Sequence, residues 1–461
     1  NKVQVDLLNN HPKYTSYNRL RELKGVKIVH SEARSWFRQN IEKFDVIQMS
    51  LIDTWAATGA GAFALSENGL YTVNAWTVIL NDLNENGVFT VSRWHKKDAI
   101  NETARILSLA MGTLYESGII NPRNHIFLAT SGRIATLIVS KTPLTSEQLG
   151  RLHQISDEME FKVISSPMMA KATGVLENIL RAKNMDDLIT ITKNEPYYDL
   201  TPPTDMRPFF FNQVRFSNPF YIVKLALSKD FGAHLGQAKA TLNLFVIIVF
   251  SSIMVLLIIV LPLYKKMAQE NISLLTAGTF YFLLIGLGFM LIEISLLQAL
   301  GVFLGHPIYG LSVLLFSLIL STGLGSLLSE KIPLNTLKKQ IIWSALAFFY
   351  VLVLAMNLES AFLNFAEVSL MQRAIISVVM TMPCGLLIGF GFPTGMALIE
   401  KIDSKATPWF WGINGAAGVM GSAIAIATNI SLGLNTTLVL GGICYALLSL
   451  TFISFSVKTQ S

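Results

Sequence analysis

The stretch Phe44-Asp45-Val46-Ile47-Gln48-Met49-Ser50-Leu51-Ile52-Asp53 decides how the first half of the chain is interpreted. Its apolar residues predict a short strand over 46–49, which is followed by the hydroxyl of Ser50 and the carboxylate of Asp53. Small residues and glycines come next, between 56 and 61. In α/β folds, polar side chains at a strand end beside a glycine-rich loop are where ligands are usually held. We therefore expect a ligand-binding edge at Ser50 and Asp53.

Strand-like and helix-like segments alternate around this stretch, from residue 1 to about 235. Such alternation predicts an α/β domain with a mostly parallel sheet and crossover helices. A Ser131-Gly132-Arg133 turn between two apolar runs predicts an antiparallel hairpin at the end of the sheet. The expected strands are 3–5, 26–29, 46–49, 87–92, 125–129 and 134–140, and the expected helices are 17–23, 33–41, 71–83, 103–117 and 144–160.

The second half of the chain has the composition of a membrane protein. The whole sequence is 52% hydrophobic and only 14% charged, with a mean hydropathy of +0.49, whereas soluble domains have about a quarter charged residues. We divide the chain into an α/β domain at 1–235 and an all-helical membrane domain at 236–461. The second predicted span is expected to break near 301–307, and the fifth to be kinked by Pro383 and Pro393. The seven expected spans are 240–263, 273–300, 308–328, 341–357, 374–399, 411–432 and 436–456, each near the length of about 20 residues that crosses a bilayer.

Charges in the loops bear on orientation and on partners. Lysines occupy alternate loops between the expected spans, so the positive-inside rule places these loops in the cytoplasm and the α/β domain on the opposite side. Basic residues just before the first span favour the reverse. The net charge of +6 is scattered, which predicts no nucleic-acid partner. Cys384 and Cys444 lack the spacing of metal ligands. The lysines of the alternate loops are Lys265, Lys266, Lys331, Lys338, Lys339, Lys401, Lys405 and Lys458.

Two further carboxylates follow expected strands. Asp6 comes after the strand at 3–5, in the position where nucleotide-binding α/β folds hold ribose hydroxyls, although an ordinary surface aspartate is the alternative. The glycine-rich turn that normally precedes such an acid is expected upstream of Asn1. Glu32 comes after the strand at 26–29, and it can either accept a hydrogen bond from an adenine amino group or cap the helix that follows.

The order of these motifs resembles spermidine synthases, and more closely the membrane-fused spermidine synthase-like proteins of bacteria. The resemblance implies a Rossmann-like domain of the methyltransferase and spermidine synthase type, followed by transmembrane helices in the bacterial inner membrane. It also implies a cytoplasmic α/β domain, decarboxylated S-adenosylmethionine or a related S-adenosyl compound as cofactor, a polyamine as partner, and aminopropyl transfer as activity. The motifs are Val5-Asp6, Ser31-Glu32-Ala33-Arg34, 44–53, 70–76 and Gly87-Val88-Phe89, the linker Thr201-Pro202-Pro203-Thr204-Asp205-Met206-Arg207-Pro208-Phe209-Phe210-Phe211, and the membrane segments 288–293, 304–309, 389–395 and 411–415.

The resemblance also assigns roles to residues. Ser50 stands where the family has its catalytic aspartate, and Asp53 matches the family's second acid. A serine hydroxyl does not act as a base near neutral pH without another base beside it, and Asn74 and Met206 replace two further acids. The alternative is therefore a catalytically inactive polyamine- or nucleotide-binding module, fused to a transporter-like or structural membrane domain and acting as a homo-oligomer or in a larger membrane assembly. Trp55, Glu67, Tyr71 and Trp76 are the candidate amine-binding residues, with packing in the core as the other interpretation of the aromatic ones.

Polar side chains inside the expected spans form a last candidate site. Such groups are costly in a bilayer unless they are buried against partners, which makes them functional candidates. A cluster around Glu293 would bind a cation or relay protons. The alternative is a structural hydrogen bond or ion pair that holds helices together, Glu293 with Arg373 for example. Small residues over 412–423 predict close helix packing. The candidate membrane residues are Glu293, Gln298, His306, Arg373 and Asn414.

Overall fold

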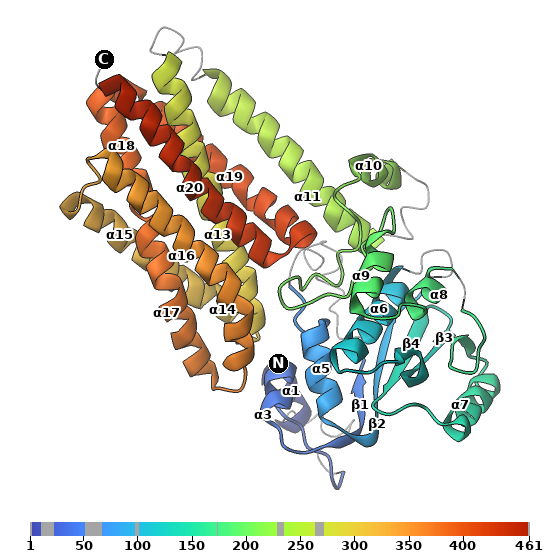
Figure 1. Ribbon diagram of the computed structural model, residues 1–461. Coiled ribbons are helices and arrows are strands. Elements are labelled where there is room, and N and C mark those ends of the chain that lie inside the picture. The colour runs from blue at the N-terminus through green and yellow to red at the C-terminus, as the bar shows by residue number, and fades with distance from the viewer. Residues whose placement is uncertain are drawn as a thin grey trace.

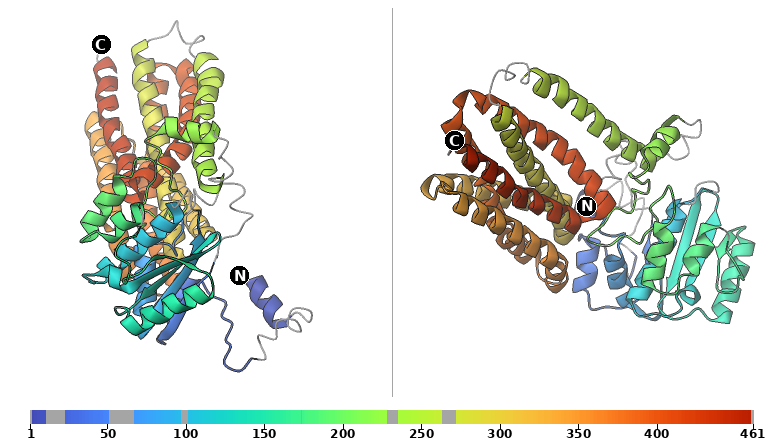
Figure 2. Two further views of the ribbon diagram at one scale, coloured as in Figure 1. Left: turned by 90° about the vertical axis from the view of Figure 1, so that its right-hand side faces the viewer. Right: turned by 45° about the horizontal axis from the view of Figure 1, so that its top comes forward.

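The computed structural model describes residues 2–10, 23–50, 67–96, 101–172, 174–227, 235–262 and 272–459. It has an α/β part, up to Leu227, and a helical part, from Leu235 (Figure 1). Figure 2 shows the long helices lying alongside one another, with the α/β part at one end of them. We call the contact region between the two parts the junction.

The α/β part contains a five-stranded sheet in the order β1-β2-β4-β3-β5. Only the β1–β2 pairing is parallel, and the other three pairings are antiparallel. Its elements are α1 (Lys2–Asn10), α3 (Ala33–Gln39), β1 (Phe44–Met49), α5 (Val73–Asn81), β2 (Leu83–Trp94), α6 (Asn101–Glu116), the 3₁₀ turn η3 (Pro122–His125), β3 (Ile126–Ser131), β4 (Ile134–Ser140), α7 (Ser146–Glu158), β5 (Lys162–Ser165), α8 (Val175–Leu180), α9 (Met185–Lys193) and α10 (Pro219–Leu227).

The prediction of a mostly parallel sheet is wrong. The β3–β4 hairpin is confirmed, but it does not lie at the end of the sheet, because β4 pairs with β2 on one side and β5 pairs with β3 on the other. Two expected strands are also absent from the described residues. Residues 3–5 belong to α1, in which Val3 and Leu7 repeat at helical rather than strand spacing. Residues 26–29 lead into α3 without a strand partner, and 17–22 lie outside the described residues.

One face of the sheet is buried by helices. Strand register aligns Ile47, Phe89 and Val139 in a row across β1, β2 and β4, and all three side chains are buried. Helices α5 and α6 pack on this face. The opposite face is more open, and Val46 on β1 is 59% exposed. Because side chains alternate between faces along a strand, the sheet presents one core face, and α7 packs beside β5 at its end (Figure 1).

The helical part has six helical segments long and apolar enough to span a membrane among the described residues. The first expected span corresponds to α11 and η5, whose apolar stretch Thr241–Leu257 is shorter. The elements are α11 (Leu235–Met254), the π-helix η5 (Val255–Val260), α13 (Ile272–Leu304), α14 (Pro307–Leu314), the π-helix η6 (Leu315–Ile319), α15 (Leu320–Lys331), α16 (Leu337–Asn364), α17 (Leu370–Ile388), α18 (Gly391–Ile402), the 3₁₀ turn η7 (Ser404–Ala406), α19 (Thr407–Leu432) and α20 (Leu434–Thr459).

Both helix interruptions expected from glycine and proline are confirmed. Helix α13 ends at Leu304, and α14 begins at Pro307 after Gly305, whose positive φ of 79° is readily adopted only by glycine. Helix α17 ends at Ile388, and α18 begins at Gly391. The connection from α13 to α14 lies at the junction.

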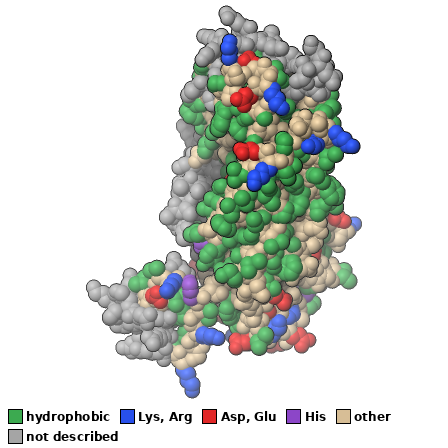
Figure 3. Space-filling view, turned by 90° about the vertical axis from the view of Figure 1, so that its left-hand side faces the viewer, with side chains coloured by type: hydrophobic (Ala, Val, Ile, Leu, Met, Phe, Trp, Pro, Cys, Tyr) green, Lys and Arg blue, Asp and Glu red, His purple; other side chains and the backbone are tan. Residues whose placement is uncertain are grey.

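The surface of the helical part is banded. Figure 3 shows hydrophobic side chains along the middle of the helices and Lys and Arg side chains gathered at the end away from the α/β part. This is the surface expected of helices that cross a bilayer. The chain is therefore a multi-pass membrane protein by the length and composition of these helices.

Candidate functional site

The junction begins with α3, whose first turn is capped by Glu32. The Glu32 carboxylate accepts hydrogen bonds from the backbone N–H groups of Arg34 (2.9 Å) and Ser35 (2.7 Å). Capping is thus the role that the structure shows for Glu32, and both carboxylate oxygens are used in it. Arg34 and Arg38 are four residues apart and therefore lie on one face of α3. Helix α3 delivers these two guanidinium groups and the Ser35 hydroxyl to the junction.

A buried ion pair joins α3 to the linker segment. Arg34 donates from Nη1 to Asp205 Oδ1 (2.8 Å) and from Nη2 to Asp205 Oδ2. The Thr72 hydroxyl donates to the same Oδ1 (2.8 Å), and the backbone N–H of Asp205 donates to Asn74 Oδ1 (3.0 Å). Bidentate Arg–carboxylate pairs are geometrically specific. Asp205 is therefore held in one orientation by three side chains.

The next two residues attach the linker to the helical part. The backbone N–H of Leu434 donates to the Met206 carbonyl (2.8 Å), and Arg207 Nε donates to the Ile430 carbonyl (2.8 Å). Arg207 Nη2 also pairs with Asp199. We call Asp205, Met206 and Arg207 the clasp. The clasp holds the turn between α19 and α20, which is Gly433 alone, with φ +89°.

On the other side of the junction, α17 contacts α3 through Arg373. Its Nη1 donates to the Phe303 carbonyl at the end of α13 (2.7 Å), and its Nη2 donates to Ser35 Oγ (3.0 Å). The Phe303 ring stacks on Phe362 of α16, with centroids 4.4 Å apart. Arg373 is 5% exposed. It therefore ties α13, α17 and α3 together.

Glycines at the end of α13 allow the α/β part to approach closely. A Cβ at Gly301 would overlap Glu67 Oε1, and one at Gly305 would lie 3.0 Å from Glu32 Cγ. A Cβ at Gly310 of α14 would lie 2.7 Å from the backbone nitrogen of Gly301. Burial raises the pKa of Glu67 from 4.5 to about 7, against the lowering effect of a backbone hydrogen bond. A carboxyl group that titrates near neutral pH thus faces the end of a membrane helix.

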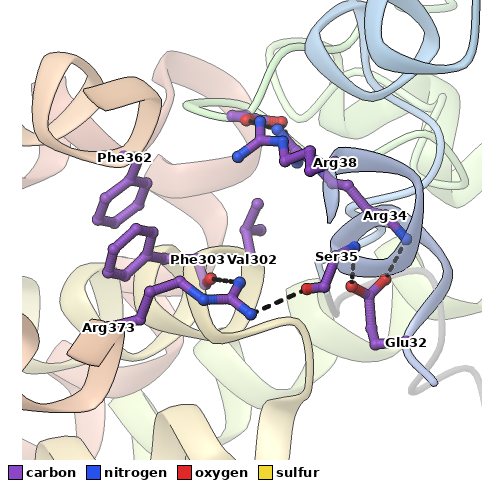
Figure 4. A pocket seen from close by; sticks show the side chains of 9 residues that line it. Glu32, Arg34, Ser35, Arg38, Val302, Phe303, Phe362 and Arg373 are labelled. Atoms are coloured by element: carbon purple, nitrogen blue, oxygen red, sulfur yellow. Dashed lines mark hydrogen bonds and ion pairs between the residues drawn. The ribbon is translucent and has the colours of Figure 1, made fainter. Parts of the chain in front are cut away.

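These contacts enclose a recess, shown in Figure 4 with the side chains of α3 on one side and Arg373, Phe303 and Phe362 on the other. Arg38 lines it and has no hydrogen bond or ion pair to the described residues. Burial, and then the neighbouring Arg34 guanidinium, lower the pKa of Arg38 to about 10, so it stays protonated at neutral pH. The Nε atoms of Arg34 and Arg373 are buried and have no hydrogen-bond partner in the described part of the chain. The full lining is Glu32, Arg34, Ser35, Arg38, Asp205, Val302, Phe303, Phe362 and Arg373.

The predicted catalytic edge is described only at its start. Ser50 is exposed directly after β1, and Asp53 and Trp55 lie outside the described residues. Tyr71 and Trp76, two predicted amine-binding residues, are 2% and 1% exposed. Tyr71 stacks on Phe210, with centroids 4.7 Å apart, and the Trp76 indole N–H donates to the Leu70 carbonyl (3.1 Å). Both aromatic rings are packed in the core, as the alternative interpretation held.

The other predicted residues are dispersed. Asp6 is exposed on α1 and follows no strand, contrary to the expected strand end. Gln298 Oε1 accepts from Asn429 Nδ2 (2.7 Å), which joins α13 to α19. His306 Nδ1 accepts from the N–H of Ile308 (3.2 Å) and caps α14. Asn414 lies beside Gly286 at the α13–α19 contact. Glu293 forms no ion pair with Arg373 among the described residues, but Gln298 and Arg373 each make a hydrogen bond that joins α13 to another helix, as the structural alternative held.

Three residues that the sequence assigned to three different sites meet at one place. Glu32, Glu67 and Arg373 all contact the stretch from Gly301 to Gly305 at the end of α13. The sequence interpretation missed Arg34, Ser35, Arg38 and Arg207. The signal available for Arg207 was the linker motif 201–211, whose charged residues lie between prolines and phenylalanines and are for that reason candidates for burial. Comparisons with protein-family models, with curated proteins and with solved structures find no match to this chain.

Proposed function

We propose that this chain is a membrane protein whose α/β part binds a ligand and transmits its binding to the membrane helices, without itself catalysing a reaction. The observation that carries the proposal is a continuous series of polar contacts through the junction. Arg373 of α17 donates to Ser35, and the preceding residue, Arg34, pairs with Asp205. Met206 then accepts from Leu434 at the start of α20.

This series is suited to transmitting a displacement because its central pair, Arg34 and Asp205, is buried and fixed by several hydrogen bonds. Arg34 and Asp205 have side chains only 9% and 5% exposed, and removing one partner of such a pair leaves an uncompensated buried charge. Coupling between sites requires an element that both sites bias. Here α3 and the clasp contact two separate regions of the helical part, the start of α17 and the α19–α20 turn, so a ligand that moved α3 would act on both.

The proposed coupling can be tested by hydrogen–deuterium exchange on the full-length protein in lipid nanodiscs. Asp205→Asn keeps the shape of the side chain and removes its charge. We expect faster amide exchange at the start of α17 and at residues 429–437 in this variant. Asp82→Asn is the matched control, because Asp82 is also buried but pairs with Lys43 away from the junction. Faster exchange confined to the α/β part in Asp205→Asn would overturn the coupling.

Aminopropyl transfer is the second candidate, and the exposure of Ser50 directly after β1 favours it. The activity would place an S-adenosyl compound and an amine near Ser50 and Asp53. Incubation of the full-length protein with decarboxylated S-adenosylmethionine and putrescine should then give spermidine, and Asp53→Asn should abolish it. Asp157→Asn, an exposed change on α7, is the control. Absence of product from the unmodified protein would exclude this candidate.

A further inference from the structure

The junction recess is rich in hydrogen-bond donors and poor in acceptors. Three guanidinium groups and two carboxylates line it, which leaves a formal charge of +1. Arg34 forms an ion pair with Asp205, and both carboxylate oxygens of Glu32 accept backbone hydrogen bonds at the start of α3. Arg38 therefore remains without a carboxylate partner among the described residues. A cationic amine would be repelled here, so the recess does not suit the polyamine that the sequence suggested.

The uncommitted donors come from two different helices. Arg38 belongs to α3, and the buried Nε of Arg373 belongs to α17. The Ser35 hydroxyl accepts from Arg373, and its own hydrogen is donated to no described residue. Guanidinium groups match the geometry of phosphate oxygens, and an oxyanion with several oxygens can accept from donors on opposite walls. The recess thus has the donor set of an oxyanion site.

The remaining wall is apolar. Val302 and Phe303 come from the end of α13, and Phe362 comes from the end of α16. These helix ends lie at the edge of the hydrophobic band, where a bilayer would present its headgroups. Basic pockets between membrane helices on the cytoplasmic side of bilayers bind phosphate-containing headgroups, and the same guanidinium chemistry is present here at the junction end of the helices.

We propose that the junction recess binds a phosphate group, with Arg38 as its principal ligand and with Ser35 and Arg373 as further donors. This inference names the ligand class of the proposed coupling function and rests on it for its biological role. The phosphate can be carried by a lipid headgroup or by a soluble molecule. Because Arg34 and Arg373 also hold the junction together, a phosphate bridging α3 and α17 would tighten the same contacts that transmit the signal.

The test uses the full-length protein, stripped of lipid in maltoside micelles and free of phosphate buffer. The midpoint of thermal unfolding is followed while inorganic phosphate or short-chain phosphatidylglycerol is added, with sodium chloride as the ionic-strength control. Binding to the folded state raises the midpoint with ligand concentration and gives an apparent Kd. We expect a rise with at least one of the two ligands. A rise with both indicates a site for soluble phosphate, whereas a rise with the lipid alone identifies the headgroup as the source.

Variants then localise the binding. Arg38→Gln should weaken the apparent affinity about ten-fold or more, because a charge-assisted hydrogen bond is lost. Arg38→Lys should retain more of the affinity, and it guards against a variant that merely misfolds. Arg151→Gln, an exposed arginine on α7, should bind like the unmodified protein. Equal affinities of Arg38→Gln and Arg151→Gln, or no rise with either ligand, would overturn the site.

The two proposals fail separately. If phosphate binds with the expected Arg38 dependence but leaves exchange at residues 429–437 unchanged, the site stands and the coupling falls. If neither ligand binds while Asp205→Asn still accelerates that exchange, the coupling stands and the phosphate site falls.

Discussion

Arg34 and Asp205 lie 171 residues apart in the chain and form a bidentate ion pair that is almost completely buried. The pair unites the start of the α/β part with the linker that leads to the membrane helices. Lys43 and Asp82 form a second pair in the same part of the protein, but Lys43 is 49% exposed. The two pairs differ in solvent access, and their contributions to stability should differ accordingly.

Removing one partner of the buried pair should be costly. We expect Asp205→Ala to lower the apparent free energy of unfolding by about 3 to 5 kcal/mol, because it leaves the Arg34 charge buried and unpaired. Lys43→Ala should cost less than Asp205→Ala, because the Lys43 side chain is 49% exposed and this pair is open to water on the lysine side. Chemical unfolding of both variants in the same detergent measures the difference. Similar losses in the two variants would show that the Arg34–Asp205 pair is not desolvated in the protein.

The junction should be more stable in mildly acidic solution because of Glu67. Its folded-state pKa of about 7 exceeds the ordinary 4.5, so the folded protein binds more protons than the unfolded chain between these values. The contribution is fully present below about pH 4.5 and is lost as the pH rises through 7. We expect the free energy of unfolding to fall by about 1 to 2 kcal/mol over this pH range. This is less than a fully buried carboxyl group would give, since Glu67 is only partly buried.

Unfolding midpoints measured from pH 5 to pH 8 test this expectation. Glu67→Gln should flatten the decline in stability, whereas Glu85→Gln, which changes an exposed residue of β2, should leave the decline as it is. A decline that persists unchanged in Glu67→Gln would assign the titration to another group.

Two glycines of α15 offer a matched pair. A Cβ at Gly325 would overlap the Leu386 carbonyl oxygen of α17, whereas a Cβ at Gly323 would meet nothing within 4 Å. Gly325→Ala should therefore separate α15 from α17 and lower the unfolding midpoint. Gly323→Ala should be neutral or stabilising by up to about 1 kcal/mol, since alanine favours helix. Thermal unfolding of both variants tests this expectation. Equal unfolding midpoints would contradict the close contact between α15 and α17 at Gly325.

The α/β part is expected on the extracytoplasmic side. The start of α16, which carries Lys338, and the connection from α18 to α19, which carries Lys405, lie at the end of the helices away from the junction (Figure 1). By the positive-inside rule that end is cytoplasmic. A membrane-impermeant maleimide on intact cells should label Glu85→Cys directly and Lys338→Cys only after permeabilisation. Cys384 and Cys444 are buried and serve as internal controls. The reverse labelling would place the α/β part in the cytoplasm.

Local patterns predicted local structure well. The strand at 46–49, the helix within 71–83 and the hairpin around Gly132 follow from side-chain periodicity and turn residues, which act over a few positions. The breaks before Pro307 and near Gly389 follow from the backbone properties of glycine and proline. The prediction that failed was the relative direction of the strands in the sheet. Periodicity states which face of β4 is buried, but it does not state that β4 returns antiparallel beside β2.

The candidate site could be predicted only in fragments. Glu32, Glu67 and Arg373 were each recognisable as charged residues in unusual surroundings, yet 338 positions separate Ser35 from Arg373, and no spacing rule spans that distance. Arg38 carried no signal at all, because an arginine on a short amphipathic helix is ordinary until its neighbours are known. These residues lie close together only because the α/β part and the helical part pack against each other.

The connection between α19 and α20 has a mechanical consequence. Gly433 is the whole of that connection, and the backbone on either side of it is fixed to the clasp. A connection of one residue leaves little freedom for the two helix ends to move apart. Helices α19 and α20 must therefore tilt or slide together at this end. A displacement of Met206 and Arg207, which hydrogen-bond to the backbone on either side of Gly433, would move α19 and α20 together and would be carried along both helices to their opposite ends.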